Sequence, residues 1–234
     1  MGLKPLSYDI KRFGSEQEPV IVIDNYTESI ERLKRRAYRA KYKVGQAFYP
    51  GIQAHEDPNY LGVRGEELTE LMSNIFGVTG KIELESCNYS LVCRPRDKLA
   101  MAQCLPHYDA HDPSLFAIVH YIQAPENSGT AFYKHKRTGF ETITEDRTDI
   151  YNRALQDDLA DYGPPARDYF YDTNESYEMI GEIKAQPDQL IIYRGYTLHS
   201  GCIPSAVELT TNPLKARITL NSFLWARYIS HYNG

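Results

Sequence analysis

The sequence predicts one mainly β domain with flanking helices. Its 234 residues are within the size range of a single all-β barrel or sandwich. No repeat, long linker or block of charge marks a boundary between domains. From residue 82 onwards, short runs rich in β-branched and aromatic residues alternate with turn residues, which is typical of an antiparallel sandwich or barrel. We therefore expect residues 1–234 to form a single domain with its β core at residues 82–226.

The segment before the core, residues 1–80, is expected to be a mainly helical support. The apolar run PVIVIDN at residues 19–25 predicts a strand. Asn25, followed three residues later by Glu28, resembles a capping box that starts a helix. A second helix is predicted at residues 66–76, where the apolar residues keep helical spacing.

Six strands are predicted in the core, at residues 82–93, 114–123, 129–136, 177–185, 189–195 and 216–225. An insertion at residues 140–178 interrupts them. Within it, residues 144–162 have helical spacing, with Tyr151, Leu155 and Leu159 on one face, and are followed by a glycine and two prolines. Residues 49–55, YPGIQAH, are expected to form an ordered loop over the barrel mouth that contacts substrate.

The composition argues against several classes of protein. A net charge of −5, from 26 basic and 31 acidic residues, is too negative overall for a protein that binds phosphate backbones. No apolar stretch is long enough for a membrane span or a signal peptide. The four cysteines have neither CxxC spacing nor the density of a disulfide scaffold. We expect a cytoplasmic protein with reduced thiols that binds neither nucleic acid nor membrane.

A candidate metal site lies in the segment PHYDAHDP, residues 106–113. His107 and Asp109 are two residues apart, so on an extended segment their side chains project to the same face. Two imidazoles and one carboxylate form the facial triad that holds Fe(II) and leaves positions open for a cosubstrate and oxygen. The HxD spacing alone is a weak indication, because it also occurs by chance in proteins that bind no metal.

Two further segments carry residues suited to a ligand site. His199 follows an apolar strand and a turn, in a His-Ser-Gly context that core packing explains poorly. Arg217 and Thr219 share one face of the predicted last strand. A guanidinium beside a hydroxyl is a good receptor for a buried carboxylate. A structural salt bridge is the alternative role for Arg217.

The order of these segments resembles the iron(II)- and 2-oxoglutarate-dependent dioxygenases: HxD, a distal histidine after a strand, and a basic residue on the last strand. The prolyl 4-hydroxylase-like branch is the most similar, including an uncharacterised bacterial group with the same PHYDAHDP and LHSG segments. The resemblance covers residues 82–226 and implies a double-stranded β-helix, a jelly-roll relative of the cupins. It also implies that GTAFY, residues 129–133, is the central strand opposite the metal.

The same resemblance implies the cofactors, the reaction and the site residues. Fe(II) and 2-oxoglutarate would be the cofactors, and a C–H bond of an amino acid, peptide or small metabolite would be hydroxylated with O2 while 2-oxoglutarate is decarboxylated to succinate. The implied iron ligands and catalytic residues are His107, Asp109 and His199. The implied cosubstrate-binding residues are Arg217, Thr219 and Tyr121.

One spacing departs from the family pattern. Arg217 lies eighteen residues after His199, farther than is usual in this branch, and we expect the extra residues to form a longer hairpin. Otherwise Lys215 or Arg194 would be the carboxylate partner, or the cosubstrate would not bind. Two other functional classes also stay open: a non-catalytic cupin-like module that binds a ligand or a partner, and a metal-dependent isomerase or hydrolase on the same fold.

Several other side chains are weaker candidates. His111 could extend the metal site, whereas His120 is expected to be a buried, hydrogen-bonded imidazole. Cys202 is expected to be a small buried thiol. Three tyrosines are candidates for the walls of the cosubstrate pocket: Tyr89, Tyr108 and Tyr121.

Overall fold

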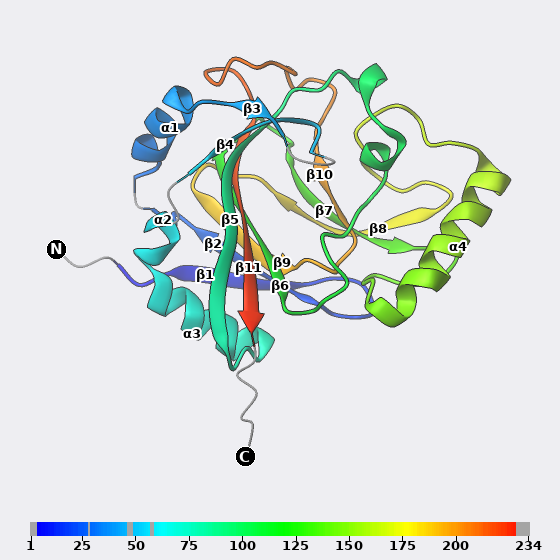
Figure 1. The fold of residues 1–234 in the computed structure, drawn as a ribbon, viewed down its shortest axis with the longest axis horizontal. Helices are drawn as coiled ribbons and strands as arrows, with labels where there is room; N and C mark the ends of the chain where they lie inside the picture. The colour runs from blue at the N-terminus through cyan, green and yellow to red at the C-terminus, as the bar shows by residue number, and fades with distance from the viewer. Residues whose placement is uncertain (1–3, 28, 46–48, 57–58, 228–234) are drawn as a thin grey trace.

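The computed structural model describes residues 4–27, 29–45, 49–56 and 59–227. These residues form two antiparallel β-sheets with α-helices around them (Figure 1). The large sheet has eight strands in the order β1-β2-β9-β6-β11-β5-β4-β3, and the small sheet has three in the order β10-β7-β8. The predicted mainly β class with flanking helices is confirmed.

The eleven strands are β1 (Ser7–Arg12), β2 (Pro19–Asp24), β3 (Lys43–Val44), β4 (Gly51–His55), β5 (Lys81–Val92), β6 (Leu115–Gln123), β7 (Gly129–His135), β8 (Tyr177–Lys184), β9 (Gln189–Arg194), β10 (His199–Cys202) and β11 (Ile218–Arg227). The helices are α1 (Ile30–Arg39), α2 (Asn59–Gly62), α3 (Gly65–Phe76) and α4 (Glu145–Tyr162), with short 3-10 turns at Arg96–Lys98 and Met101–Cys104.

The two sheets pack against each other through an inner apolar layer. Side chains alternate between the two faces of a strand, so every second residue of β2, β6 and β9 points into this layer. The layer contains Val20, Val22, Ala117, Tyr121, Phe132, Ile183, Ile191 and Tyr193. Phe132 and Ile183 come from the small sheet, so this cluster joins the two sheets into one core.

The outer face of the large sheet is covered by the N-terminal helices. Leu33 and Ala37 of α1 pack on β5 and β11, and Leu71 and Met72 of α3 pack in the cluster of the β2, β6 and β9 side chains. Both helices bury one apolar stripe, as amphipathic surface helices do. The inner face of the same sheet is therefore left for the site between the sheets.

The insertion between β7 and β8 contains α4, which lies at the far side of the molecule from α1 (Figure 1). The predicted helix at 144–162 is confirmed, and the face predicted from Tyr151, Leu155 and Leu159 is the face turned toward the protein. Tyr151, Ala154 and Asp158 are buried, whereas Leu155 and Leu159 are only partly buried. Asp158 is buried because its carboxylate accepts hydrogen bonds from the ring of His135 and the guanidinium of Arg137.

Three predictions about the N-terminal segment are wrong in detail. Helix α1 begins at Ile30, because Asn25 has a left-handed backbone with φ 51° and cannot cap it; Glu28 lies outside the described residues. Residues 51–55 are not a loop over the barrel mouth but strand β4, paired with β5. The segment also contributes β1, β3 and β4 to the large sheet, more β structure than the sequence predicts. No helix of the described residues is long and apolar enough to cross a membrane.

Candidate metal centre and cosubstrate pocket

Backbone pairing brings the HxD segment beside the distal histidine. The amide of His107 donates to the carbonyl of His199 at 2.9 Å, and the amide of His199 donates back at 2.8 Å. Two residues on, the amide of Asp109 donates to the carbonyl of Gly195 at 2.7 Å. His107 and Asp109 are therefore held as a short extended segment against the turn between β9 and β10, with both side chains on the same face, as the spacing predicts.

The three side chains converge. Their ligand atoms all lie within 4.8 Å of one another, and among the described residues no other group of three or more His, Cys, Asp or Glu side chains does so. Nε2 of His199 is 3.7 Å from Oδ2 of Asp109, and Nε2 of His107 is 4.0 Å from Oδ1 of the same carboxylate. The centroids of the two imidazole rings are 4.3 Å apart. This spacing suits three atoms that share one ion.

Electrostatics favour a cation among these groups. Desolvation lowers the pKa of His199 to about 4 and raises that of Asp109 to about 6, so near neutral pH the imidazole is neutral and the carboxylate is largely ionised. These are the protonation states that metal ligands need. Oδ2 of Asp109 is buried without a hydrogen-bond partner among the described residues. A buried carboxylate oxygen without a partner is costly, and a bound metal ion would satisfy it; the site therefore fits a metal.

Supporting groups fix the orientation of the ligands. Nδ1 of His199 lies 2.9 Å from the carbonyl oxygen of Thr197, so it donates to that carbonyl and leaves Nε2 free as the ligand atom, a common arrangement around metals. The ring of Tyr193 packs edge-on against the His199 ring at 4.8 Å. A Cβ at Gly195 would lie 3.2 Å from Cβ of Asp109, so a glycine lets the turn approach this ligand closely.

Arg217, Thr219 and Tyr121 lie together on the inner face of the large sheet. Thr219 pairs with Tyr121 across β11 and β6, and the Arg217 guanidinium lies 5.9 Å from the centroid of the Tyr121 ring. Nη2 of Arg217 donates to the carbonyl of Gly129 at 3.2 Å. Arg217 is 4% exposed, and its Nε has no hydrogen-bond partner among the described residues. A buried guanidinium with an unused N–H donor is suited to binding an anion.

The alternatives to Arg217 lie elsewhere. Lys215 is exposed. Arg194 donates to the carbonyl of Phe76 at 2.7 Å and packs over the rings of Phe76 and Phe116 on the outer side of the sheet. Within the described part of the chain, no carboxylate forms a salt bridge with Arg217, which disfavours a purely structural ion pair as its role.

The distance between the two candidate ends follows from the register of the small sheet. His199 pairs with Phe132 of β7, whereas Arg217 contacts Gly129, three residues earlier on the same strand. At about 3.3 Å per strand residue this separates the two ends by roughly 10 Å. A small dicarboxylate held at both ends would span a separation of this order.

One residue near Arg217 is missing from the sequence-based site. Asn221 has a buried Oδ1 without a hydrogen-bond partner among the described residues. It lies two residues after Thr219 on β11, so strand alternation would have placed it on the same inner face. Tyr49 belongs to the segment 49–55 that was expected to contact substrate. Burial raises the pKa of its hydroxyl, and Arg217 lies close enough for its positive charge to oppose that rise.

The weaker candidates have different positions. His111 is exposed, is not part of the triad, and lies 3.3 Å from the hydroxyl of Thr148 on α4. His120 is buried and hydrogen-bonded to Asp188, as expected. Cys202 is also buried. Tyr89 packs in the outer cluster with α1 and does not line the pocket, whereas Tyr108 lies beside the rings of His111 and Tyr151.

Comparison with solved structures finds proteins that this chain resembles over most of its length. The non-haem α-ketoglutarate-dependent epimerase SnoN from nogalamycin biosynthesis is 9% identical, with a TM-score of 0.50, over 90% of this chain and 79% of that one. HygX from Streptomyces hygroscopicus is 11% identical, with a TM-score of 0.49, over 90% and 84%. A prolyl-4-hydroxylase from Pseudomonas putida is 8% identical, with a TM-score of 0.46, over 91% and 95%. The likeness to SnoN bears on the fold alone, and with the two antiparallel sheets it shows that the chain has a jelly-roll fold.

Sequence comparison shows the family. No curated protein matches the chain. Residues 4–224 match the model of a family of unknown function, DUF6445. That match spans nearly all of the described residues, including both sheets and every residue of the candidate site. The chain belongs to the DUF6445 family.

Proposed function

We propose that this protein is an Fe(II)- and 2-oxoglutarate-dependent oxygenase that hydroxylates a C–H bond of an amino acid, a peptide or a small metabolite. The observation that carries the proposal is the convergence of His107, Asp109 and His199, with Oδ2 of Asp109 buried and unpartnered. The fold shared with SnoN supports it. In such a site Fe(II) would supply the redox chemistry with O2 and 2-oxoglutarate.

The three residues of the triad would bind the metal ion and fix its position. Asp109 contributes the negative charge, and the two imidazoles contribute neutral nitrogen ligands. The hydrogen bond from His199 to Thr197 keeps the His199 proton on Nδ1 and away from the metal. His107 is about half exposed, with 53% of its side chain accessible, whereas His199 is 6% exposed. The accessible side of the site is therefore the His107 side, from which we propose that substrate enters.

At the other end of the pocket, Arg217 binds the distal carboxylate of the cosubstrate. Its guanidinium offers two parallel N–H groups to a carboxylate, and the hydroxyl of Thr219 lies on the same strand face. Tyr121 forms the wall beneath Arg217, while its own hydroxyl hydrogen-bonds Thr130 at 2.7 Å. These groups exclude water from the carboxylate and fix the orientation of the molecule that spans the roughly 10 Å to the triad.

The insertion lies beside the substrate side of the site. Thr148 and Tyr151 of α4 contact His111 and Tyr108, which flank the HxD ligands. We propose that this helix helps to select the substrate, because residues at the entrance of a pocket decide what enters. We further propose that residues 1–234 form one domain, since β2 lies inside the large sheet between β1 and β9. A cytoplasmic location fits the four free cysteines.

An anaerobic titration tests the function. Fe(II) is added to metal-free protein with and without 2-oxoglutarate, and the metal-to-ligand charge-transfer absorbance is recorded; succinate is then measured after O2 is admitted. We expect absorbance that saturates at one equivalent and succinate that forms only with both cofactors. Metal binding without a 2-oxoglutarate signal would favour an isomerase or hydrolase. The absence of both signals would favour a non-catalytic module.

A further inference from the structure

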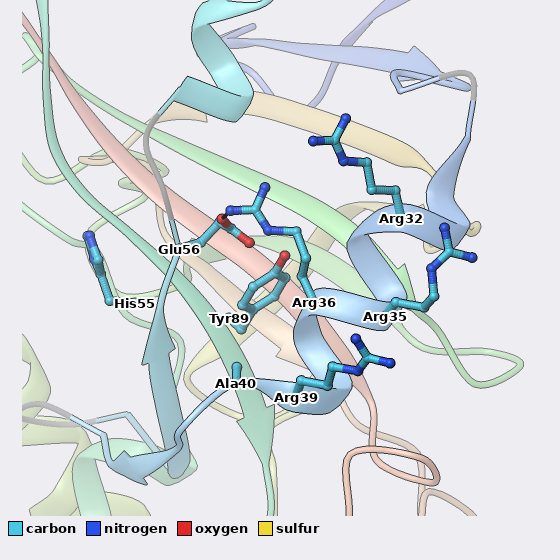
Figure 2. A pocket seen from close by; sticks show the side chains of 8 residues that line it. All are labelled: Arg32, Arg35, Arg36, Arg39, Ala40, His55, Glu56 and Tyr89. Carbon is cyan, nitrogen blue, oxygen red and sulfur yellow. Dashed lines mark hydrogen bonds and ion pairs between the residues drawn. The ribbon is translucent and has the colours of Figure 1, made fainter.

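A second candidate site lies on the outer face of the large sheet. An open hollow of about 580 Å³ is lined by Arg32, Arg35, Arg36, Arg39, Ala40, His55, Glu56 and Tyr89. Figure 2 shows the four arginines on α1, with Arg36 extending toward Glu56 and Arg35 and Arg39 extending on the other side of the helix. In sequence they form two pairs, Arg32 with Arg36 and Arg35 with Arg39. Each pair is four residues apart and so lies on adjacent turns of the helix. The hollow therefore has a strongly positive wall.

Only one of these arginines has a counter-charge in the described part of the chain. Arg36 forms an ion pair with Glu56, which is 3% exposed. The guanidinium groups of Arg32, Arg35 and Arg39 have no ion pair or hydrogen bond to any described residue. With one carboxylate against four guanidinium groups, the lining has a formal charge of +3 (4 − 1), on a protein whose net charge is −5.

Helix stability does not explain this arrangement. Like charges three or four residues apart repel one another and destabilise a helix. Arg36 and Arg39, in the last turn, interact favourably with the helix dipole, but Arg32 lies near the N-terminus of α1, where a positive charge is unfavourable. A feature that breaks a local rule without a stabilising partner indicates function.

Burial does not explain it either. Leu33 and Ala37 supply the apolar face by which α1 packs on the sheet, and the arginines lie outside that contact. The ion pair with Glu56 instead holds the guanidinium of Arg36 in a fixed orientation among the four arginines.

We propose that this hollow binds a compact polyphosphate, an anion that carries two or more phosphate groups. Arginine presents a planar fork of donors that matches phosphate oxygens. Four guanidinium groups distributed over eight residues of helix, Arg32 to Arg39, about 10 Å in length, exceed what one phosphate group can contact. The volume is in the range of small-molecule sites. The hollow is largely open to solvent, so the charge of its lining is what favours an anion, and the protein's net charge of −5 disfavours a long nucleic-acid strand.

The hollow is separate from the candidate metal centre. Tyr89 lines the hollow on the outer face of β5, whereas the next residue, Ser90, points to the inner face, where Gln53 donates to its hydroxyl at 3.0 Å. One thickness of sheet therefore separates the two sites. The anion site does not depend on the proposed oxygenase activity, and binding at it can be measured without iron or 2-oxoglutarate.

Isothermal titration calorimetry with inorganic tripolyphosphate tests the proposal. We expect one saturable site per chain in the wild type. The double variant Arg35→Gln/Arg39→Gln should raise the dissociation constant about 100-fold, about tenfold for each lost charge-assisted contact. The matched control Arg153→Gln/Lys184→Gln removes the same charge from exposed residues elsewhere and should change the constant less than about threefold. Glutamine keeps helix propensity, and circular dichroism checks that α1 is intact.

Three further probes identify the source of the phosphate groups. Inorganic monophosphate should bind much more weakly than tripolyphosphate. Phosphatidylcholine vesicles with and without phosphatidylinositol bisphosphate distinguish a lipid headgroup from a soluble ligand, since only the former would carry the protein to the vesicle. A single-stranded oligonucleotide that binds where tripolyphosphate does not would overturn the compact ligand in favour of a nucleic acid. No binding of tripolyphosphate, or equal loss in both double variants, would also overturn the proposal.

Discussion

Replacing Arg217 with alanine tests how the pocket holds its cosubstrate. Arg217 is 4% exposed, and its Nε is unpartnered among the described residues, so a bound carboxylate would form a charge-assisted pair away from water. Removing one partner of a buried pair leaves the other uncompensated, at a cost of about 3 to 5 kcal/mol. At about 1.4 kcal/mol per factor of ten, Arg217→Ala should weaken 2-oxoglutarate binding by roughly two to three and a half orders of magnitude.

The measurement is an anaerobic titration of 2-oxoglutarate into the Fe(II)-loaded protein, followed by charge-transfer absorbance. Fe(II) affinity, measured separately, should be unchanged. Lys215→Ala is the matched control, because this residue is exposed two positions away, and it should leave cosubstrate affinity within about twofold. The thermal midpoint of the metal-free Arg217→Ala protein should not fall, since an unpaired buried charge is removed. Unchanged 2-oxoglutarate affinity in Arg217→Ala would refute the assignment.

Three other perturbations probe the site and its surroundings. Asp109→Ala should abolish tight Fe(II) binding in anaerobic calorimetry while His111→Ala leaves it nearly unchanged; the reverse ranking would contradict the triad. Gly195→Ala would place a Cβ 3.2 Å from Cβ of Asp109 and should weaken Fe(II) binding about tenfold with an unchanged circular dichroism spectrum; equal affinity would show that the turn can move aside. Desolvation lowers the pKa of His120 and of His135 in the folded protein, so each takes up a proton on unfolding below its unfolded pKa of about 6.5. The free energy of unfolding should then decrease as the pH falls below about 6.5, by up to about 1.4 kcal/mol per pH unit for each histidine. Urea titrations of the metal-free protein at several pH values measure this slope. His120→Gln should reduce it, and an unreduced slope would contradict the argument.

The central strands were predictable because they are short runs rich in β-branched and aromatic residues, buried on both faces and separated by turn residues. All six strands predicted after residue 82 are present, as β5 to β9 and β11. Strand β1 was missed because it lies at the edge of the sheet with all six residues exposed, and its two large apolar residues, Tyr8 and Ile10, make too short an alternation to predict a strand. Strand β4 was missed because it follows a Pro-Gly pair, which indicates a turn, and its five residues, GIQAH, include few β-branched or aromatic side chains.

The start of α1 shows the limit of a local motif. Asn25 has the residue type and spacing of a helix cap, but the chain turns once more before α1 begins at Ile30. In that turn the amide of Tyr26 donates to the backbone carbonyl of Asp188, and the amide of Thr27 donates to its carboxylate. Asp188 is 161 residues from Thr27 in the sequence. A contact over that separation overrides the local signal, and no pattern within one segment reports it.

The candidate ligands were identifiable by residue type and order, but their convergence depends on pairing between distant segments. The backbone bridge between His107 and His199 joins residues that the sequence separates by four strands, β6 to β9, and the α4 insertion. The supporting groups Thr197 and Gly195 could be inferred only once that bridge was known. Thr197 acts through its backbone carbonyl oxygen and Gly195 through the absence of a Cβ, and neither role can be predicted from the residue type alone.

Strand register explains why the long spacing between His199 and Arg217 does not displace the arginine. Ile218, the next residue, pairs with Leu91 of β5 and with Gln123 of β6, so the start of β11 is fixed by two neighbouring strands. The connection before it can lengthen at small cost, because the entropy of closing a loop grows only with the logarithm of its length. Arg217 therefore contacts the Gly129 carbonyl of β7, the strand that also pairs with His199. The distance between the two ends of the pocket is set by residues along β7, and the number of residues in the connecting loop has no part in it.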